Sequence, residues 1–410
     1  MAQHPFLKSI RPVNLLSFGP NTEEIELRPL NILIGPNGSG KSNLIEVIRL
    51  LWLLPEKEPW SVVLETGGVD EWIWKGVNGK NPHGSIDVKL SLGSIPQSNS
   101  IFDYDYSIRL DRFQASFRIG KEIIRETKRT DGSMSNDNWL ESNGMQGEIL
   151  PRSASPGAAP RYLGLSADRS ILSQLPQVQI QLAGFGLFLS ELYEIGKFFD
   201  SFDFHQDWEF GADLTPRDPI PVGQPVERLE EDARNLAQML AYYKDYHRPI
   251  FDQINEQMKL FYAPLKSIEP RLIGTHLQVV INEEGGFSIP AYRLSDGTLR
   301  WLAMLTILLN PTPAPVTCID EPELGLHPDM ISTLADLLRD ASTRTQLIVT
   351  THSQSLVSEF SDDPESVCVC EKIEGSTRIR RLGKEKLSSW LEDYSLGQLW
   401  AKGEIGGNRW

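Results

Sequence analysis

The stretch Gly35-Pro36-Asn37-Gly38-Ser39-Gly40-Lys41-Ser42 governs the interpretation of the whole chain. It fits the pattern G-x-x-x-x-G-K-[ST], the phosphate-binding P-loop or Walker A motif. The apolar run at 30–34 predicts a buried strand before it, and the apolar spacing at 43–50 predicts a helix after it. A loop between a strand and a helix is the context that this motif requires, so we expect a P-loop and not a chance glycine-rich turn.

These residues predict a nucleotide site. The glycines let backbone N–H groups turn toward a polyphosphate, and the N-terminus of the following helix adds partial positive charge. We expect Lys41 to reach the β- and γ-phosphates of ATP, and Ser42 to place its hydroxyl on Mg²⁺. The expected nucleotide-binding residues of this loop are Gly35, Pro36, Asn37, Gly38, Ser39, Gly40, Lys41, Ser42 and Asn43.

Length, charge and cysteine content narrow the class of protein. The chain has 410 residues, enough for two or three structural units, and a formal net charge of −15. An acidic chain is a poor candidate for wrapping nucleic acid over a broad surface, although a local basic patch could contact phosphates. Three cysteines in apolar runs indicate core packing instead of a disulfide framework or a metal site. With no apolar N-terminal signal and no run long enough to span a bilayer, we expect a cytoplasmic protein that does not enter a membrane.

The sequence pattern changes after the P-loop helix. Alternation with period 2 between about 84 and 150 predicts antiparallel strands, and the Pro- and Gly-containing stretch 151–160 predicts a loop. Helical spacing from about 225 to 262 predicts two helices, which Pro249 separates or of which it opens the second. Residues 278–292 predict a hairpin.

A second strand ends in paired carboxylates. The run at 315–319 is apolar and leads into Asp320 and Glu321. In a P-loop protein such a strand end is where the Walker B acid is expected. We expect Asp320 to hold Mg²⁺, directly or through water, and Glu321 to polarise the attacking water as general base. The alternative is a strand capped by two solvated acids, and the P-loop in the same chain weighs against it.

Two further segments fit the same chemistry. The apolar strand at 346–351 leads to His352, whose neutral imidazole could hydrogen-bond the γ-phosphate or the attacking water. Ser295 and Gly297 precede an apolar helix, and a serine hydroxyl, a glycine backbone and a helix N-terminus make an anion site. Taken alone, His352 would more often be structural, and the serine would be an ordinary helix cap. The prediction therefore depends on the order of all four motifs.

That order resembles the ABC-type ATPase head, in the branch that contains structural-maintenance-of-chromosomes (SMC) proteins, RecF and OLD-family ATPases. The segment 321–328 is similar to the stretch after Walker B in RecF- and OLD-like ATPases. The ending at 394–410 resembles that of a bacterial single-head AAA-family ATPase group within this branch. The resemblance implies an α/β P-loop NTPase fold, with an ABC-ATPase-like head, an antiparallel β lobe and a short helical insertion.

The same resemblance implies a division into domains. Residues 1–80 and 270–410 would form the two halves of the ATPase head. Residues 81–165 would form the antiparallel β-rich part, and residues 166–269 a mainly helical insertion.

The resemblance also implies a homodimer in which two heads pair head-to-tail and sandwich two ATP molecules. ATP would then drive association because it binds the dimer better than the monomer, and hydrolysis would release the pair. The catalytic and metal-binding groups of one chain would meet the signature residues of the other. These groups are Lys41, Ser42, Asp320, Glu321 and His352 in one chain, and Ser295 and Gly297 in the second copy.

Some positions depart from the pattern of ABC transporters. Asp296 stands where transporter signatures usually have glycine, and Thr298 stands in place of glutamine. No glutamine occurs between Lys41 and Gln97, so the Q-loop glutamine has no match, and whether Asp70 or a water replaces it near Mg²⁺ stays open.

We expect ATP hydrolysis to drive a switch in DNA repair or anti-phage defence. OLD-family proteins carry a C-terminal TOPRIM nuclease domain, and the 58 residues after His352 are too few for one, so we expect a separate effector, TOPRIM-like or another nuclease. Basic clusters at 125–129 and 378–386 could contact DNA, although each is more often a solvated face.

Two alternative functions remain. One is an ABC-transporter nucleotide-binding subunit. The missing Q-loop glutamine and the 254 residues from Lys41 to Ser295 argue against it, because transporter heads place the signature much closer to the P-loop. The other is a nucleotide-gated scaffold without turnover, which the intact Asp320, Glu321 and His352 disfavour.

Overall fold

A computed structural model describes most of the chain, and the described part forms two compact units. Unit 1 consists of Met1–Phe202, Glu365–Gly383 and Gly403–Trp410, and unit 2 of Asp203–Pro364 and Lys384–Lys402. The described residues are 6–76, 81–94, 101–128, 138–144, 146–149, 161–175, 186–206, 210, 215–223 and 226–407. The expected loop at 151–160 lies outside them. The expected domains 1–80 with 270–410, 81–165 and 166–269 stay a prediction.

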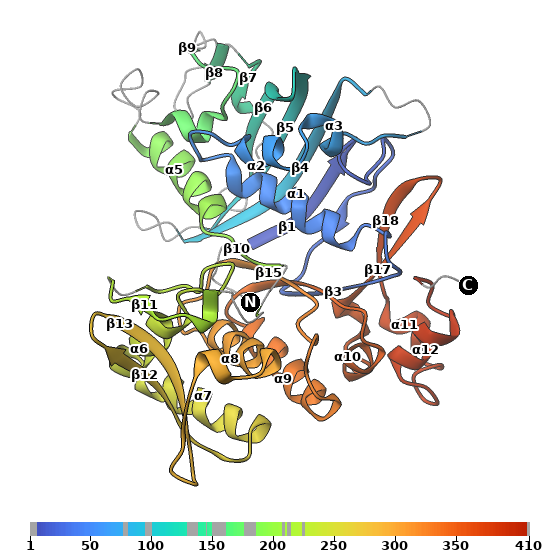
Figure 1. Ribbon diagram of the computed structural model, residues 1–410. Coiled ribbons are helices and arrows are strands. Elements are labelled where there is room, and N and C mark those ends of the chain that lie inside the picture. The colour runs from blue at the N-terminus through green and yellow to red at the C-terminus, as the bar shows by residue number, and fades with distance from the viewer. Residues whose placement is uncertain are drawn as a thin grey trace. The chain divides into compact units, whose positions relative to one another are not determined.

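Unit 1 contains an antiparallel sheet whose strands follow the order β2-β1-β4-β5-β6-β7-β8-β9 (Figure 1). Along β5 the side chains of Tyr104, Tyr106, Ile108 and Leu110 are buried, and the residues between them are more exposed. Period-2 alternation of this kind buries one face of a sheet, so the predicted antiparallel lobe is confirmed. The strands are β1 (Phe6–Val13), β2 (Ile25–Glu26), β4 (His83–Ser94), β5 (Ile101–Phe113), β6 (Ser116–Lys128), β7 (Asn138–Ser142), β8 (Gln146–Ile149) and β9 (Arg161–Gly164).

A second group of strands in unit 1 carries the P-loop. Strand β3 (Leu30–Ile34) is buried along its whole length and pairs in parallel with β17 (Val367–Ile373), which pairs antiparallel with β18 (Ser376–Arg381). A short, fully apolar run such as β3 is typical of a strand covered on both faces. Cys368 and Cys370 of β17 are buried free thiols, as expected of core cysteines.

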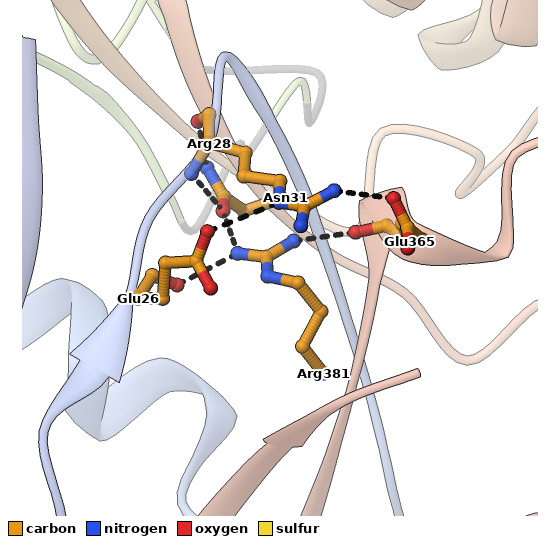
Figure 2. Close-up of polar contacts among 5 residues, drawn as sticks. All are labelled: Glu26, Arg28, Asn31, Glu365 and Arg381. Atoms are coloured by element: carbon orange, nitrogen blue, oxygen red, sulfur yellow. Dashed lines mark hydrogen bonds and ion pairs between the residues drawn. The ribbon is translucent and has the colours of Figure 1, made fainter. Parts of the chain in front are cut away.

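A polar cluster joins distant parts of the chain at this second group of strands (Figure 2). Arg381 donates to the backbone oxygens of Glu26 and Glu365, both at 2.7 Å, and to Asn31 Oδ1 at 2.6 Å. Arg28 forms an ion pair with the Glu365 carboxylate at 2.7 Å. These bonds tie the segment that leads into β3 to residues more than 300 positions later.

Helices α1 (Lys41–Leu53), α2 (Ser61–Glu65), α3 (Val69–Trp72) and α5 (Gly186–Asp200), with the 3-10 turn η1 (Ile171–Gln174), belong to the described part of unit 1. Helix α1 contacts α5, and α5 also contacts β4 (Figure 1). Buried Leu44, Ile48 and Leu51 recur on one face of α1 at helical spacing. This face holds the helix in place behind the P-loop.

Unit 2 contains the parallel strands β10 (Asp203–His205), β15 (Val316–Asp320) and β16 (Gln346–Thr350), with Asp320 opposite Thr350. Because β15 and β16 are parallel and end side by side, the residues that follow the two strands lie at the same edge of the sheet. The helices of this unit are α6 (Leu236–Tyr246), α7 (Arg248–Phe261), α8 (Asp296–Leu308), α9 (Ile331–Ala341), α10 (Gln354–Glu359), α11 (Lys384–Leu387) and α12 (Leu396–Lys402). Within the described residues, no helix is long and apolar enough to cross a membrane.

The two helices predicted between 225 and 262 are present as α6 and α7, but the first begins later than expected. Ala233 has a φ of 56°, in the left-handed region that an α-helix of L-residues does not contain. Asn235 accepts the Glu230 N–H and donates to Arg228 O, both at 2.9 Å, which stabilises turns before α6. Pro249 lies in the first turn of α7, as predicted.

The predicted hairpin is present and has additional strands. Strands β13 (His276–Glu283) and β14 (Ser288–Pro290) pair antiparallel, and β12 (Leu265–Ile273) pairs with the other side of β13. The short β11 (Ile220–Pro221) also pairs with β13. Helices α6 and α7 contact β12.

Candidate nucleotide site

The P-loop connects β3 to α1 in unit 1, as predicted. Gly40 precedes α1 with a φ of 99°, and a Cβ atom there would lie 2.1 Å from Thr377 Oγ1. Gly35 has a φ of 152°, and its Cβ would lie 2.3 Å from Cys370 O. Both positions need glycine because any side chain would collide with β17 or β18.

Lys41 is buried, and the loop itself holds its ammonium group. Nζ donates to Gly35 O at 2.9 Å and to Pro36 O at 3.3 Å. These two carbonyl groups keep the Lys41 ammonium group within the loop, where the phosphates of a nucleotide would compete with them for its N–H donors. Ser42, in the first turn of α1, is exposed.

A residue that the sequence did not single out anchors this loop. Thr377 of β18 is fully buried and donates from Oγ1 to Ser39 O at 2.8 Å. Its Oγ1 also lies 2.7 Å from Ser17 Oγ, and its N–H donates to Ser17 O at 2.8 Å. Thr377 lies far from the P-loop in the sequence and at no fixed motif spacing, so the sequence carries no signal that points to it.

Asp320 and Glu321 lie at the carboxyl end of β15 in unit 2, where Thr350 binds both. Thr350 Oγ1 donates to the Asp320 carboxylate and accepts the Glu321 N–H at 3.2 Å. Glu321 has a φ of 46°, a conformation that residues other than glycine rarely adopt. Such a backbone persists only when its surroundings hold it, and it is often found at functional sites.

His352 lies beside Glu321, with Nε2 3.4 Å from Glu321 Oε1. The two side chains are 35% and 28% exposed, so they are adjacent and still open to solvent. Glu323 holds the backbone next to them, since its Oε1 accepts the His352 N–H at 3.1 Å and the Thr351 hydroxyl at 2.6 Å. Burial raises the pKa of the Glu323 carboxyl, although these hydrogen bonds oppose the shift.

The residues expected to bind Mg²⁺ suit that ion. In the described residues, no group of three or more His, Cys, Asp or Glu side chains could hold a metal ion. Mg²⁺ in nucleotide sites needs only a few protein oxygens, because the phosphates and waters supply the rest. The hydroxyl of Ser42 in unit 1 and the carboxylate of Asp320 in unit 2 are oxygen donors of this kind.

The signature residues Ser295 and Gly297 lie at the N-terminus of α8 in unit 2. Ser295 is the N-cap: its Oγ accepts the Thr298 N–H at 3.2 Å and lies 2.7 Å from Thr298 Oγ1. A Cβ atom on Gly297 would lie 2.6 Å from Gly325 O. The start of α8 therefore lies so close to the loop after Walker B that only glycine fits at position 297.

The structure thus brings Asp320, Glu321 and His352 together within unit 2, and groups the P-loop residues in unit 1. Their chemical roles stay predictions. Asp70, one suggested replacement for the Q-loop glutamine, forms an ion pair with Arg112.

The basic cluster at 378–386 is partly used inside the fold. Arg380 Nη2 donates to Ile405 O at 3.0 Å, and Arg381 belongs to the cluster of Figure 2. In the other cluster, Arg129 lies outside the described residues. DNA contact stays a prediction for both.

The sequence profile of a known family covers all four motifs. The AAA_21 family, described as "AAA domain, putative AbiEii toxin, Type IV TA system", matches residues 30–358. The chain belongs to the AAA_21 family. It is therefore an ABC-type P-loop ATPase domain, and nucleotide binding follows from its family.

Curated relatives match a smaller part of this AAA_21 chain. The chromosome partition protein Smc of Clostridium kluyveri (strain NBRC 12016) is 36% identical over 87 residues, 21% of this chain and 7% of that protein. The protein of the same name from Desulfitobacterium hafniense (strain Y51) is 34% identical over 102 residues, 25% of this chain and 8% of that protein. The chain thus spans less than a tenth of the length of these relatives.

Solved SMC heads share the fold of this AAA_21 chain. An SmcHead bound to the C-winged helix domain of ScpA has a TM-score of 0.53 at 14% identity, covering 94% of this chain and 99% of that one. An Smc head domain with an extended coiled coil, bound to the C-terminal domain of ScpA derived from Pyrococcus furiosus, has a TM-score of 0.50 at 13% identity, covering 95% and 99%. The predicted α/β head with an antiparallel β lobe is confirmed.

Proposed function

We propose that this AAA_21 chain hydrolyses ATP to ADP and phosphate, and that two copies pair on the nucleotide. The observation that carries the proposal is that Oε1 of Glu321, the residue after Asp320, lies 3.4 Å from Nε2 of His352. A carboxylate and an imidazole at this distance, both partly exposed, can act on one water molecule or phosphate.

Each group has a distinct task in this proposal. Glu321 takes a proton from the attacking water, and His352 hydrogen-bonds the γ-phosphate. Lys41 balances the charge that develops on the β- and γ-phosphates as the bond to the leaving ADP breaks. Mg²⁺, held by Ser42 and Asp320, would neutralise phosphate charge.

The signature residues complete the site from a second copy. Ser295 and Gly297 lie where the N–H groups of α8 begin, and a helix N-terminus favours a phosphate. Because the nucleotide would contact both copies, ATP stabilises the pair more than the monomer.

We infer that this pair acts as a switch in anti-phage defence or DNA repair and drives a separate, nuclease-like effector protein. The family description names a toxin of a type IV toxin–antitoxin system, which favours defence. A solved SMC head of this fold was bound to a domain of ScpA, so the fold is compatible with a protein partner.

The central experiment compares the wild type with Glu321→Gln and Lys41→Ala in ATP turnover and in mass in solution with and without ATP. We expect Glu321→Gln to lose about 10²-fold or more in turnover, to keep binding ATP, and to accumulate as an ATP-bound dimer. Lys41→Ala should bind ATP weakly and stay monomeric. Equal turnover in wild type and Glu321→Gln would remove Glu321 from the role of base.

The effector is tested by purifying the native complex. A nuclease-like protein should co-purify with the Glu321→Gln form in ATP and be reduced with Lys41→Ala. If no such protein accompanies either form, the inference of a separate effector is contradicted, and the ATPase proposal is unaffected.

A further inference from the structure

Arg217 is a buried arginine outside every predicted motif. It ends the short 3-10 turn η2 (Thr215–Arg217) in unit 2, and only 5% of its surface is exposed. A guanidinium group is rarely buried to this extent unless acceptors surround it. The positions of those acceptors therefore show what this charge holds in place.

In the described part of the chain, three acceptors of Arg217 belong to residues 291–296, which we call the signature turn. Arg217 Nη1 donates to Ala291 O at 3.2 Å and to Leu294 O at 2.6 Å, and Nη2 donates to the Asp296 carboxylate. Nε donates to Phe210 O at 2.7 Å, which ties the arginine to the chain preceding η2. The guanidinium group thus binds the signature turn on both sides of Ser295.

This arrangement orients the residue expected to face the γ-phosphate. The Ser295 hydroxyl oxygen accepts the Thr298 N–H, and Arg217 holds the Leu294 carbonyl before Ser295 and the Asp296 carboxylate after it. A planar guanidinium with donors in fixed directions constrains such a turn more strongly than an ammonium group could. The direction of the first N–H groups of α8 is set by the same contacts.

The ion pair also changes the charge at the start of α8. Asp296 is the first residue of the helix, and its side chain is 67% exposed. An unpaired carboxylate there would repel a γ-phosphate presented by a second copy. Arg217 offsets this repulsion, while its own side chain, 6% exposed, is too deeply buried to bind a phosphate itself.

We propose that Arg217 is a positioning residue for the signature turn, which orients Ser295 and neutralises Asp296 so that α8 can accept the ATP of a second copy. This inference rests on the proposed ATP-driven pairing. Arg217, which lies 78 positions before Ser295 in the sequence, would then be one of the residues that determine pairing. Because Arg217 binds no nucleotide in this scheme, its loss should weaken pairing and leave the P-loop's affinity for ATP unchanged.

The test uses full-length protein in the Glu321→Gln background, in which ATP is retained. The protein concentration at half-dimerisation in saturating ATP is measured from mass in solution. We expect Arg217→Gln to raise this concentration about tenfold, within the usual range of coupling between sites. Arg217→Lys should raise it less, because it keeps the charge but loses the planar arrangement of donors. Binding of a fluorescent ATP analogue to the monomer should not change in either variant.

A second substitution separates positioning from a merely structural role. Asp296→Asn added to Arg217→Gln should restore part of the dimerisation, because it removes the carboxylate left unpaired. Loss of folding would not be rescued in this way.

Arg344→Gln is the matched control. Arg344 donates to Leu308 O at 2.8 Å at the opposite end of α8 and to the Asp340 carboxylate at 2.7 Å. Its replacement should leave dimerisation unchanged.

If Glu321→Gln alone does not dimerise in ATP, the proposed pairing fails and this inference falls with it. If it dimerises and Arg217→Gln dimerises equally well, only the role of Arg217 is overturned. If Arg217→Gln does not fold, the Arg217→Lys variant is used instead. Unchanged dimerisation of Arg217→Lys would overturn the inference. Weakened dimerisation with unchanged affinity for ATP would support it.

Discussion

The imidazole Nε2 of His352 lies 3.4 Å from Oε1 of Glu321, although the two residues follow different strands. Thr350, opposite Asp320 in the parallel pair, binds both the Asp320 carboxylate and the Glu321 N–H. Glu323 holds the His352 backbone. The relative position of the imidazole and the carboxylate is therefore determined by the backbone around them.

His352→Ala should lower ATP turnover by about 10²-fold, the order of magnitude that a positioned acid–base or hydrogen-bonding group contributes. His352→Gln keeps an N–H donor and should recover part of the rate. Steady-state kcat and KM for ATP, measured with nucleotide binding, check this. A kcat for His352→Ala equal to that of the wild type would show that the imidazole is structural.

Gly297→Ala should disturb the start of α8, because its methyl group would lie 2.6 Å from Gly325 O. We expect a loss of about 1–3 kcal/mol in the free energy of unfolding from overpacking, together with weaker ATP-dependent dimerisation. Denaturant unfolding and mass in solution measure the two effects. Gly383→Ala is the control, since no atom lies within 4 Å of its added Cβ. Equal behaviour of the two variants would contradict the close packing of Gly297.

Thr377→Val should weaken ATP binding by about fivefold, because one hydrogen bond to the P-loop, worth about 1 kcal/mol, is lost from Ser39 O. The loss should be the same with Mg²⁺ and with EDTA, since Thr377 supports the loop and not the metal. Ser42→Ala should weaken binding only when Mg²⁺ is present. Titration of a fluorescent ATP analogue with Mg²⁺ and with EDTA distinguishes the two variants. If Thr377→Val weakened binding only in the presence of Mg²⁺, the role of Thr377 in supporting the loop would be contradicted.

Asp203 at the start of β10 should make the stability of the fold depend on pH. Burial raises the pKa of its carboxyl from 3.8 to about 6, and Arg228, 3.6 Å away, opposes the shift. Because the folded pKa exceeds the unfolded one, this stabilising contribution is complete below pH 3.8 and is lost as the pH rises through about 6.

Asp203→Asn should remove this dependence. At pH 8 we expect the variant to be more stable than the wild type by about 1–3 kcal/mol, and the difference to vanish below about pH 4. Denaturant unfolding between pH 4 and 8 measures the effect. A constant difference between the two proteins across this range would show that the Asp203 carboxyl is not responsible.

Local sequence patterns were sufficient for the elements that carry the motifs. Strand β3, the P-loop and α1 follow from one apolar run, two required glycines and helical spacing, because each depends on residues close together in the chain. For the 225–262 region, the sequence pattern predicts a first helix that begins earlier than α6 does. Its apolar spacing continues through Leu229 and Ala233, but Ala233 adopts a positive φ in the folded chain.

The linear order of the chain was thus enough to identify an ABC-type ATPase head, since phosphate-binding loops and acidic strand ends are short motifs with recognisable neighbours. It could not identify Thr377, Glu323 or Arg217. Each of these supports a motif through contacts with atoms distant in sequence: Thr377 with Ser39, Glu323 with His352, and Arg217 with the signature turn. Such contacts have no periodicity or fixed spacing, because they depend on how strands and turns pack in three dimensions.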